Sequence, residues 1–207
     1  MEPNKVSKKL LKRLPVYLSY IKSLPETTEN ISATKMAQAL ELGDVLVRKD
    51  LAKVSDGGRR KLGYVRKNLI RDIEEFLDMN STTQAVIIGA GKLGQALLDY
   101  CGFEKSGLHI LAGFDINPTA QKTEGGKPIY AMNRLESFCR CYDIAIGIIT
   151  VPSEHAQQVC NRLVDCNVKA IWNFSPAYLN TPDNVIVQSE NLAVSLTALR
   201  MQIKRKS

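Results

Sequence analysis

The sequence lacks the patterns that mark membrane and secreted proteins. No apolar run approaches the roughly 18 residues that a membrane-spanning helix needs. The first residues, from Met1 to Lys12, are basic and polar and contain no apolar signal core. We therefore expect a protein without membrane association that is located in the cytoplasm.

The sequence also has few residues suited to metal binding. It contains two histidines and five cysteines, and only Cys139 and Cys141 are close together in the chain. Zinc sites usually combine two closely spaced ligand pairs, and a second pair is absent. The odd number of cysteines predicts free thiols in a reducing compartment and no metal site.

Positive charge is concentrated in the first third of the chain. Residues 1–71 hold 16 Lys and Arg against 7 Asp and Glu, a net charge of +9. The remaining residues hold 12 against 14, a net charge of −2. This asymmetry predicts a polyanion-binding module joined to a second domain of another kind.

Three helices are predicted in the basic part. Pro15 suits the start of a helix, and apolar residues recur at helical spacing over residues 15–24. Ser32 is a good N-cap for a helix that ends near residue 40, and Asp44 for a third helix over residues 44–54. A glycine-containing turn before the third helix predicts a helix-turn-helix.

The third helix has the features of a recognition helix. Val47 and Leu51 share an inward face, so Lys49 is predicted to face the major groove, with Arg48 and Lys53 on its flanks. Residues 56–64 then combine glycine turns with three consecutive basic residues. We interpret them as a hairpin, or wing, that places cations in a neighbouring minor groove, namely Arg59, Arg60 and Lys61.

A dinucleotide-binding fingerprint follows a linking helix. Residues 84–88 predict a buried strand that leads into the loop Gly89-Ala90-Gly91-Lys92-Leu93-Gly94 and then a helix. Gly89 permits the tight turn, Gly91 the close approach of a pyrophosphate, and Gly94 the packing of helix on strand. The phosphates are expected at the helix N-terminus.

A carboxylate at the expected distance supports this interpretation. A second strand over residues 108–114 ends in Asp115, 21 residues beyond Gly94. In dinucleotide-binding domains such a carboxylate accepts hydrogen bonds from a ribose 2′-OH and disfavours a 2′-phosphate. We therefore expect NADH or NAD⁺, and not their phosphorylated forms, as the ligand.

Further strands and helices alternate after Asp115, as expected for a doubly wound parallel sheet. A strand over residues 143–150 ends in Thr150, Val151 and Pro152, and another over residues 169–172 ends in Asn173. Because ligands bind at the carboxyl ends of such strands, we expect these residues to flank the nicotinamide. A short strand follows at 185–187, and a terminal helix over 190–205 carries an apolar seam that either packs on its own domain or is buried by a second copy.

Taken together, these motifs resemble the Rex family of redox-sensing transcriptional repressors. The residues that carry the resemblance are, in chain order, Lys12-Arg13-Leu14-Pro15, Val47-Arg48-Lys49-Asp50-Leu51, Gly63-Tyr64, the glycine loop, Phe114-Asp115-Ile116-Asn117 and Asn173-Phe174-Ser175-Pro176. Their combined order is far more specific than any one motif.

The resemblance implies an α/β protein with three parts. They are a winged-helix DNA-binding domain with its linking helix (residues 1–80), a Rossmann domain that binds NADH or NAD⁺ (81–188) and a domain-swapped helix (189–207). It implies a homodimer on a palindromic operator that NADH releases and NAD⁺ does not. It adds Lys12, Arg13 and Tyr64 as DNA contacts and Tyr100 as a cofactor contact.

The chain departs from the family pattern at several positions. Residues 52–55 and Lys61 differ from the residues that are usual in the recognition helix and the wing of the family. These differences bear on which operator sequence is preferred, and not on DNA binding itself. Asn191 stands where many members have an Asp that contacts the tyrosine matching Tyr100. An amide cannot make the same charged contact.

Two other classes of function remain. An NAD-dependent oxidoreductase would need a substrate domain and an acid–base group, and only His155 lies near the predicted crevice. An NAD-binding scaffold whose basic domain holds another protein is the second alternative. Neither explains a recognition helix and a wing in one basic domain, so we expect a repressor with no catalytic residues.

Overall fold

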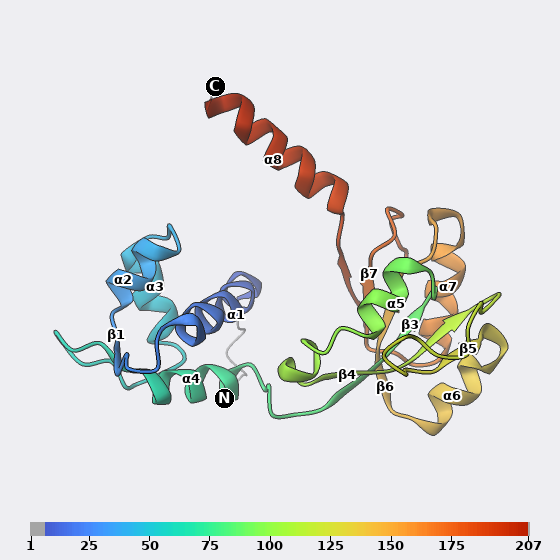
Figure 1. The fold of residues 1–207 in the computed structure, drawn as a ribbon, viewed down its shortest axis with the longest axis horizontal. Helices are drawn as coiled ribbons and strands as arrows, with labels where there is room; N and C mark the ends of the chain where they lie inside the picture. Colours follow the sequence, from blue (N-terminus) through green and yellow to red (C-terminus); the bar gives the residue numbers. More distant parts are fainter. Residues whose placement is uncertain (1–6, 207) are drawn as a thin grey trace. The chain divides into compact units, whose positions relative to one another are not determined.

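The computed structural model describes residues 7–206, and the chain forms two compact units with the boundary in the sequence between Ser81 and Thr82 (Figure 1). The first unit contains α1 (Lys8–Ser23), β1 (Asn30–Ile31), α2 (Ala33–Ala39), α3 (Asp44–Leu51), β2 (Tyr64–Val65) and α4 (Arg66–Phe76).

Helix α1 begins seven residues earlier than the sequence predicted. Ser7 is its N-cap and accepts a hydrogen bond from the backbone N–H of Lys9, so Pro15 lies inside the helix and not at its start. A proline in a helix interior removes a backbone hydrogen bond. Here it stands on the exposed face, where water can solvate the freed carbonyl, while Leu10 and Leu14 continue the buried stripe.

The start of α3 also differs from the prediction. Gly43 is the N-cap, and Asp44 is the first helical residue. The Asp44 carboxylate accepts hydrogen bonds from the Thr34 hydroxyl on α2 (3.0 Å) and from the Arg48 guanidinium on α3 (3.1 Å). Ser32 caps α2 as predicted, and its side chain accepts from the N–H of Lys35.

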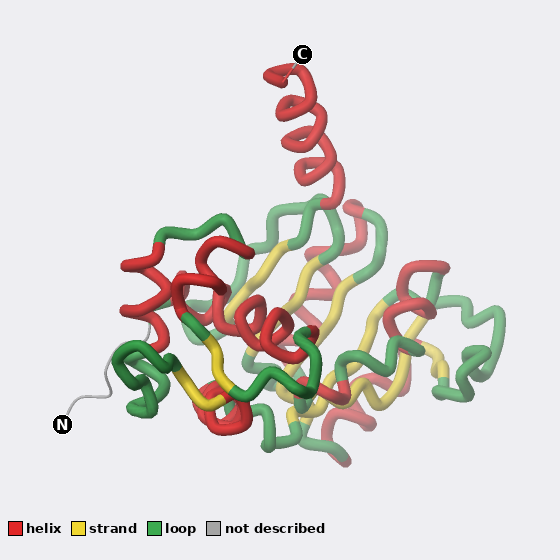
Figure 2. The backbone as a smooth tube through the Cα atoms, turned by 60° about the vertical axis from the view of Figure 1, so that its left-hand side comes forward, coloured by secondary structure: helices red, strands yellow, loops and turns green. Residues whose placement is uncertain are grey.

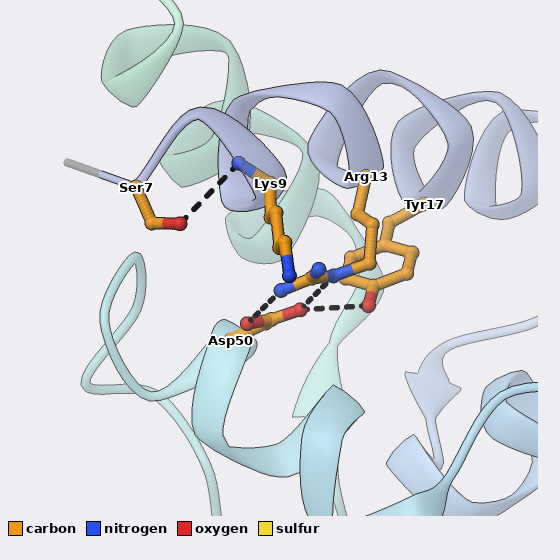
Figure 3. A network of polar contacts seen from close by, with 5 residues as sticks. All are labelled: Ser7, Lys9, Arg13, Tyr17 and Asp50. Atoms are coloured by element: carbon orange, nitrogen blue, oxygen red, sulfur yellow. Dashed lines mark hydrogen bonds and ion pairs between the residues drawn. The ribbon is translucent and has the colours of Figure 1, made fainter.

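A buried polar network ties α3 to α1 (Figure 3). The Arg13 guanidinium donates to both oxygens of Asp50, at 2.6 and 2.8 Å, and the Tyr17 hydroxyl donates to one of them at 2.8 Å. Burial alone would raise the pKa of Asp50, but these hydrogen bonds hold it below its usual value. Burial and the bond to Asp50 raise the pKa of Tyr17 to about 12.

The predicted wing is a short hairpin. Arg59 pairs antiparallel with Gly63 across its turn, and β2, which follows directly, pairs antiparallel with β1. Gly63 has φ +83°, and a Cβ there would lie 2.2 Å from the carbonyl oxygen of Ile31, so only glycine fits. Lys61 stands at the turn with a positive φ of 69°.

The second unit is a parallel sheet in the order β5-β4-β3-β6-β7-β8 (Figure 2). Numbered from its own first strand this order is 3-2-1-4-5-6, that of the Rossmann fold. Its elements are β3 (Thr83–Ile88), α5 (Lys92–Leu98), η1 (Glu104–Ser106), β4 (Leu108–Asp115), β5 (Ile129–Ala131), η2 (Met132–Arg134), α6 (Leu135–Cys141), β6 (Ile144–Ile149), α7 (Ser153–Asp165), β7 (Ala170–Asn173), β8 (Ile186–Ser189) and α8 (Leu192–Lys206). The sequence analysis did not predict β5 or α6.

Helices cover both faces of the sheet. Val86 and Ile88 of β3 pack with Leu163 of α7 on one face. Ala85 and Ile87, which alternate with them, pack with Leu98 of α5 on the other. Because both faces of β3 are buried, its side chains are apolar throughout the strand interior, as the sequence indicated.

Helix α8 leaves its apolar side chains exposed. Every described side chain from Asn191 to Lys204 is exposed, including Leu196 (67%) and Leu199 (54%). The Asn191 side-chain oxygen accepts from the N–H of Val194 and so caps the helix. Among the described residues, no helix combines the length and the apolar character that a membrane span requires.

Candidate functional site

The glycine loop leaves open space where a phosphate group is predicted. Gly91 has extended backbone angles (φ −71°, ψ −171°) and is exposed at the N-terminus of α5. A Cβ built on Gly91 would meet no atom within 4 Å. The glycine is therefore not required by packing inside the protein, which agrees with a role in the close approach of a ligand.

The other two glycines are required by the fold itself. Gly89 has φ +101°, and a Cβ there would lie 2.9 Å from the Val151 side chain. A Cβ on Gly94 would lie 1.9 Å from the carbonyl oxygen of Gly89, a contact that no side-chain movement can relieve. Thr150 fixes the same turn, because its hydroxyl donates to the Gly89 carbonyl at 2.7 Å.

Asp115 is held beside the loop at the end of β4. One carboxylate oxygen accepts from the backbone N–H of Ala90 at 2.7 Å, and the other from the N–H of Asn117 at 3.0 Å. Each carboxylate oxygen has further lone pairs, so the group can also accept from a ribose hydroxyl. Asp115 lines the same cleft as Gly89 and Gly91.

This cleft has a volume of about 410 Å³ at the carboxyl ends of the parallel strands. It is lined by Ile88, Gly89, Gly91, Asp115, Ile116, Met132, Thr150, Val151, Pro152, His155, Gln158, Val159 and Arg162. Its place at the edge where β3 and β6 meet is the crevice in which open α/β sheets bind ligands.

Several residues predicted to contact the cofactor lie outside this lining. Lys92 and Leu93 are exposed in the first turn of α5, and Tyr100 is exposed beyond the other end of that helix, packed edge-on against Phe103. Asn173 is fully buried. Its amide donates to the Ala177 carbonyl and accepts from the Ser175 N–H, so it holds the loop after β7.

The sequence interpretation missed one wall of the cleft. His155, Gln158 and Arg162 are spaced by three and four residues, so they share one face of α7. This spacing after Pro152, at the end of a predicted strand, was a usable signal. The sequence interpretation treats His155 only as an acid–base candidate for an enzyme.

Arg162 lines the cleft, and its guanidinium is fixed by hydrogen bonds. Its guanidinium donates to the Glu136 carboxylate on α6 at 2.6 and 2.9 Å and to the Met132 carbonyl at 2.7 Å. Burial alone would raise the pKa of Glu136, but the hydrogen bonds from Arg162 lower it. The ion pair therefore joins α6 to α7 behind the cleft.

In the first unit five of the nine predicted DNA-contacting side chains line one groove, and Lys12, Arg13, Lys49 and Lys53 lie outside its lining. Lys49 and Lys53 are exposed on and just after α3. A groove of about 530 Å³ separates α2 and α3 from the wing. Its lining includes Arg48, Arg59, Arg60, Lys61 and Tyr64.

Arg48 is oriented by its neighbours, whereas Arg13 is held inside the domain. Arg48 donates to Asp44 on its own helix and to the Thr34 hydroxyl on α2 at 3.0 Å. Arg13 uses its guanidinium on Asp50 and is only 23% exposed, while the adjacent Lys12 is exposed. The structure thus gives Arg13 a part in fixing α3 on α1.

Comparison with known proteins covers almost the whole chain. A family model described as a putative DNA-binding protein N-terminus matches residues 5–52, and one described as a CoA binding domain matches residues 80–177. A redox-sensing transcriptional repressor Rex of Treponema denticola is 41% identical over 95% of this chain and 94% of its own length. The chain belongs to the Rex family.

Solved Rex structures agree with this assignment. RSP, a Rex-family repressor, has been solved in complex with β-NAD⁺ and operator DNA, and this chain matches it with a TM-score of 0.89 at 32% identity, covering 99% of this chain and 95% of RSP. The structure of RSP with β-NADH matches with a TM-score of 0.86, covering 99% and 97%. These Rex relatives are named as repressors.

Proposed function

We propose that this chain is a repressor that binds operator DNA through its first unit and NADH or NAD⁺ through its second. It acts in the cytoplasm, where both the DNA and the dinucleotide pool are available. The observation that carries the proposal is the open space over Gly91, in the same cleft as the Asp115 carboxylate. The other unit of the same chain carries the helix and the hairpin that we interpret as a recognition helix and a wing.

The dinucleotide would lie along the carboxyl edge of the sheet. Its pyrophosphate would pass over Gly91, and the ribose on the adenine side would reach Asp115. The α7 face formed by His155, Gln158 and Arg162 would line the remainder of the cleft. The nicotinamide end would point toward the loops after β6 and β7, where Pro152 and Asn173 lie.

The operator would be read by α3 and flanked by the wing. Lys49 would reach base edges in the major groove, with Arg48 beside it, and Lys53 would contact phosphate. Arg59, Arg60 and Lys61 would extend the contact into the next minor groove, with Lys12 and Tyr64 at the margin.

A second copy of the chain would cover α8. A 15-residue helix with exposed apolar side chains is marginal in water and is stabilised by packing. In a twofold dimer each α8 would pack on the partner chain. Two recognition helices would then read a palindrome, with half-sites about 34 Å apart or multiples of that spacing.

Sensing requires that the ligand discriminate between conformers of the protein. A ligand that binds the DNA-competent and the released dimer equally well shifts nothing, however tightly it binds. We therefore propose that NADH favours the released arrangement and that NAD⁺ does not.

The test is a reciprocal titration. Operator affinity is measured by gel shift with no dinucleotide, with NADH and with NAD⁺, and NADH affinity is measured with and without saturating operator. Linkage requires that operator DNA weaken NADH binding by the same factor by which NADH weakens operator binding. If NADH affinity is unchanged by the operator, the chain binds both ligands without acting as a sensor.

A further inference from the structure

Two thiols meet on the second unit, away from the glycine loop. Cys139 lies near the end of α6, and Cys166 is the C-cap of α7. The two thiols influence each other's pKa, and both belong to the lining of one pocket between the ends of these helices. Both are half-buried, and both line a pocket of about 560 Å³ that opens to solvent. A small oxidant can therefore reach a pair of thiols that the fold has already brought together.

We propose that Cys139 and Cys166 form a reversible intramolecular disulfide and that a low-molecular-weight disulfide is the oxidant. This would be a thiol-oxidation site additional to the dinucleotide site, and it does not depend on the function proposed above. The juxtaposition of two thiols from the ends of two packed helices is the observation behind it.

The exchange balances in two steps. The Cys166 thiolate attacks one sulfur of the small disulfide, which gives a mixed disulfide and releases one small thiolate that takes up a proton. Cys139 then loses its proton and attacks the Cys166 sulfur, which forms the protein disulfide and releases the second small thiol. Two protein thiols are oxidised, and one small disulfide is reduced to two thiols.

The surroundings of the two thiols make their oxidation slow at neutral pH. Burial raises the pKa of Cys139 to about 12. Burial also raises the pKa of Cys166, and the negative charges of Glu136 and Asp165 raise it further. The neighbouring Cys139 and the positive charge of Arg162 lower it. Cys166 is therefore the better attacking thiol, and the rate of oxidation rises with pH because only the thiolate reacts.

A bond here would join α6 to α7, the helix that forms one wall of the dinucleotide cleft. Helix α6 already contacts α7 through the ion pair of Glu136 with Arg162, and Arg162 lines the cleft. The disulfide would add a covalent link between the same two helices. Two other cysteines lack this setting: Cys101 is exposed beyond α5, and Cys160 is a fully buried residue of α7.

The test uses the full-length protein and oxidised glutathione. After incubation, free thiols are alkylated, and the protein is digested with trypsin without reduction. The sequence separates the relevant thiols, because Cys139 falls in the peptide 135–140, Cys166 in 163–169, and Cys141 and Cys160 together in 141–162. We expect peptides 135–140 and 163–169 to be linked in protein that runs as a monomer on a denaturing, non-reducing gel. Dithiothreitol should return both to the alkylatable form.

Three single variants serve as controls. Cys139→Ser and Cys166→Ser should each abolish the linked peptide, and Cys141→Ser, which changes an exposed thiol of the same pocket, should keep it. The wild-type digest alone decides the question if either of the first two variants fails to fold. Peptide 163–169 linked to 141–162, a link between two chains, or full alkylation of Cys139 and Cys166 after oxidation would each overturn the proposal.

Discussion

The glycine loop offers a test that separates ligand binding from folding. Gly91 and Gly94 belong to one fingerprint, yet added side chains would meet opposite surroundings. At Gly91 a side chain would enter open space, and the extended backbone is allowed for any residue. At Gly94 a Cβ would come within 1.9 Å of the Gly89 carbonyl oxygen. Gly91→Val should therefore fold and fail to bind, whereas Gly94→Ala should fold poorly.

The expected magnitudes differ enough to be resolved. A dinucleotide at 100 times its dissociation constant stabilises the wild type by about 2.7 kcal/mol. At roughly 4 °C per kcal/mol for a domain of this size, the melting temperature should rise by about 10 °C. Gly91→Val blocks phosphate contacts worth about 1.5–3 kcal/mol each, so loss of two raises the dissociation constant at least about 100-fold.

Gly94→Ala acts on the fold instead. Alanine in place of glycine inside a helix gains about 1 kcal/mol of intrinsic propensity. Overpacking against backbone costs typically 1–3 kcal/mol and more when nothing can move, so the clash wins and the ligand-free melting temperature falls.

Thermal scanning measures both effects: the melting temperature without ligand reports on the fold, and its shift with NADH or NAD⁺ reports on binding. Gly91→Val should melt near the wild-type temperature without ligand and shift by no more than about 2 °C with either dinucleotide, because a 100-fold weaker ligand at the same concentration stabilises by only about 0.4 kcal/mol. A wild-type shift in Gly91→Val would refute the path of the pyrophosphate over this residue.

The remaining predictions on DNA binding and stability concern the first unit. Lys53→Ala should weaken binding to all DNA sequences and lower the salt slope by roughly one, whereas Lys49→Ala should relax discrimination at one operator position; equal losses on operator and random DNA would remove Lys49 from base reading. Tyr17→Phe should cost about 1–3 kcal/mol in urea unfolding, because it removes a buried donor to Asp50. The pKa of Asp50 is lowered in the folded state, so its stabilising contribution should be present above pH ~4 and be lost as the pH falls through the lowered value. Asp44→Asn should leave binding to random DNA unchanged and reduce operator preference, since it loosens Arg48 without removing it; equal losses on both DNAs would contradict a positioning role.

The parts of the fold that the sequence predicted are those with local causes. The fingerprint could be recognised because strand, glycines and helix follow one another directly, and the buried strands β3, β4 and β6 are mostly apolar. The start of α1 was predicted wrongly because Pro15 is a common first helical residue. The inward stripe that extends the helix back to Leu10 is fixed by packing that only the fold creates.

The parts of the site that were missed depend on contacts between distant residues. Arg162 and Glu136 are 26 residues apart, and α6, which carries Glu136, was not predicted. Asn173 was predicted as a cofactor contact from its place after a strand, but the sequence alone could not show that its amide is used inside the following loop. The position of a residue at a strand end predicts nearness to the site, and the hydrogen bonds decide its role.

Asn191 separates two roles that an acidic residue combines in many Rex proteins. Its side-chain oxygen accepts from the Val194 N–H, and Asn and Asp cap helices about equally well, so α8 begins here as it would with Asp. The contact with Tyr100 that the family resemblance implies is different, because a neutral hydrogen bond contributes about 0.5–1.5 kcal/mol and one to a charged group about 1.5–3. A ligand shifts conformers only by its differential free energy between them. We therefore expect a sensor with an intact α8 but a smaller ratio of operator affinities without and with NADH than in Rex proteins that carry Asp.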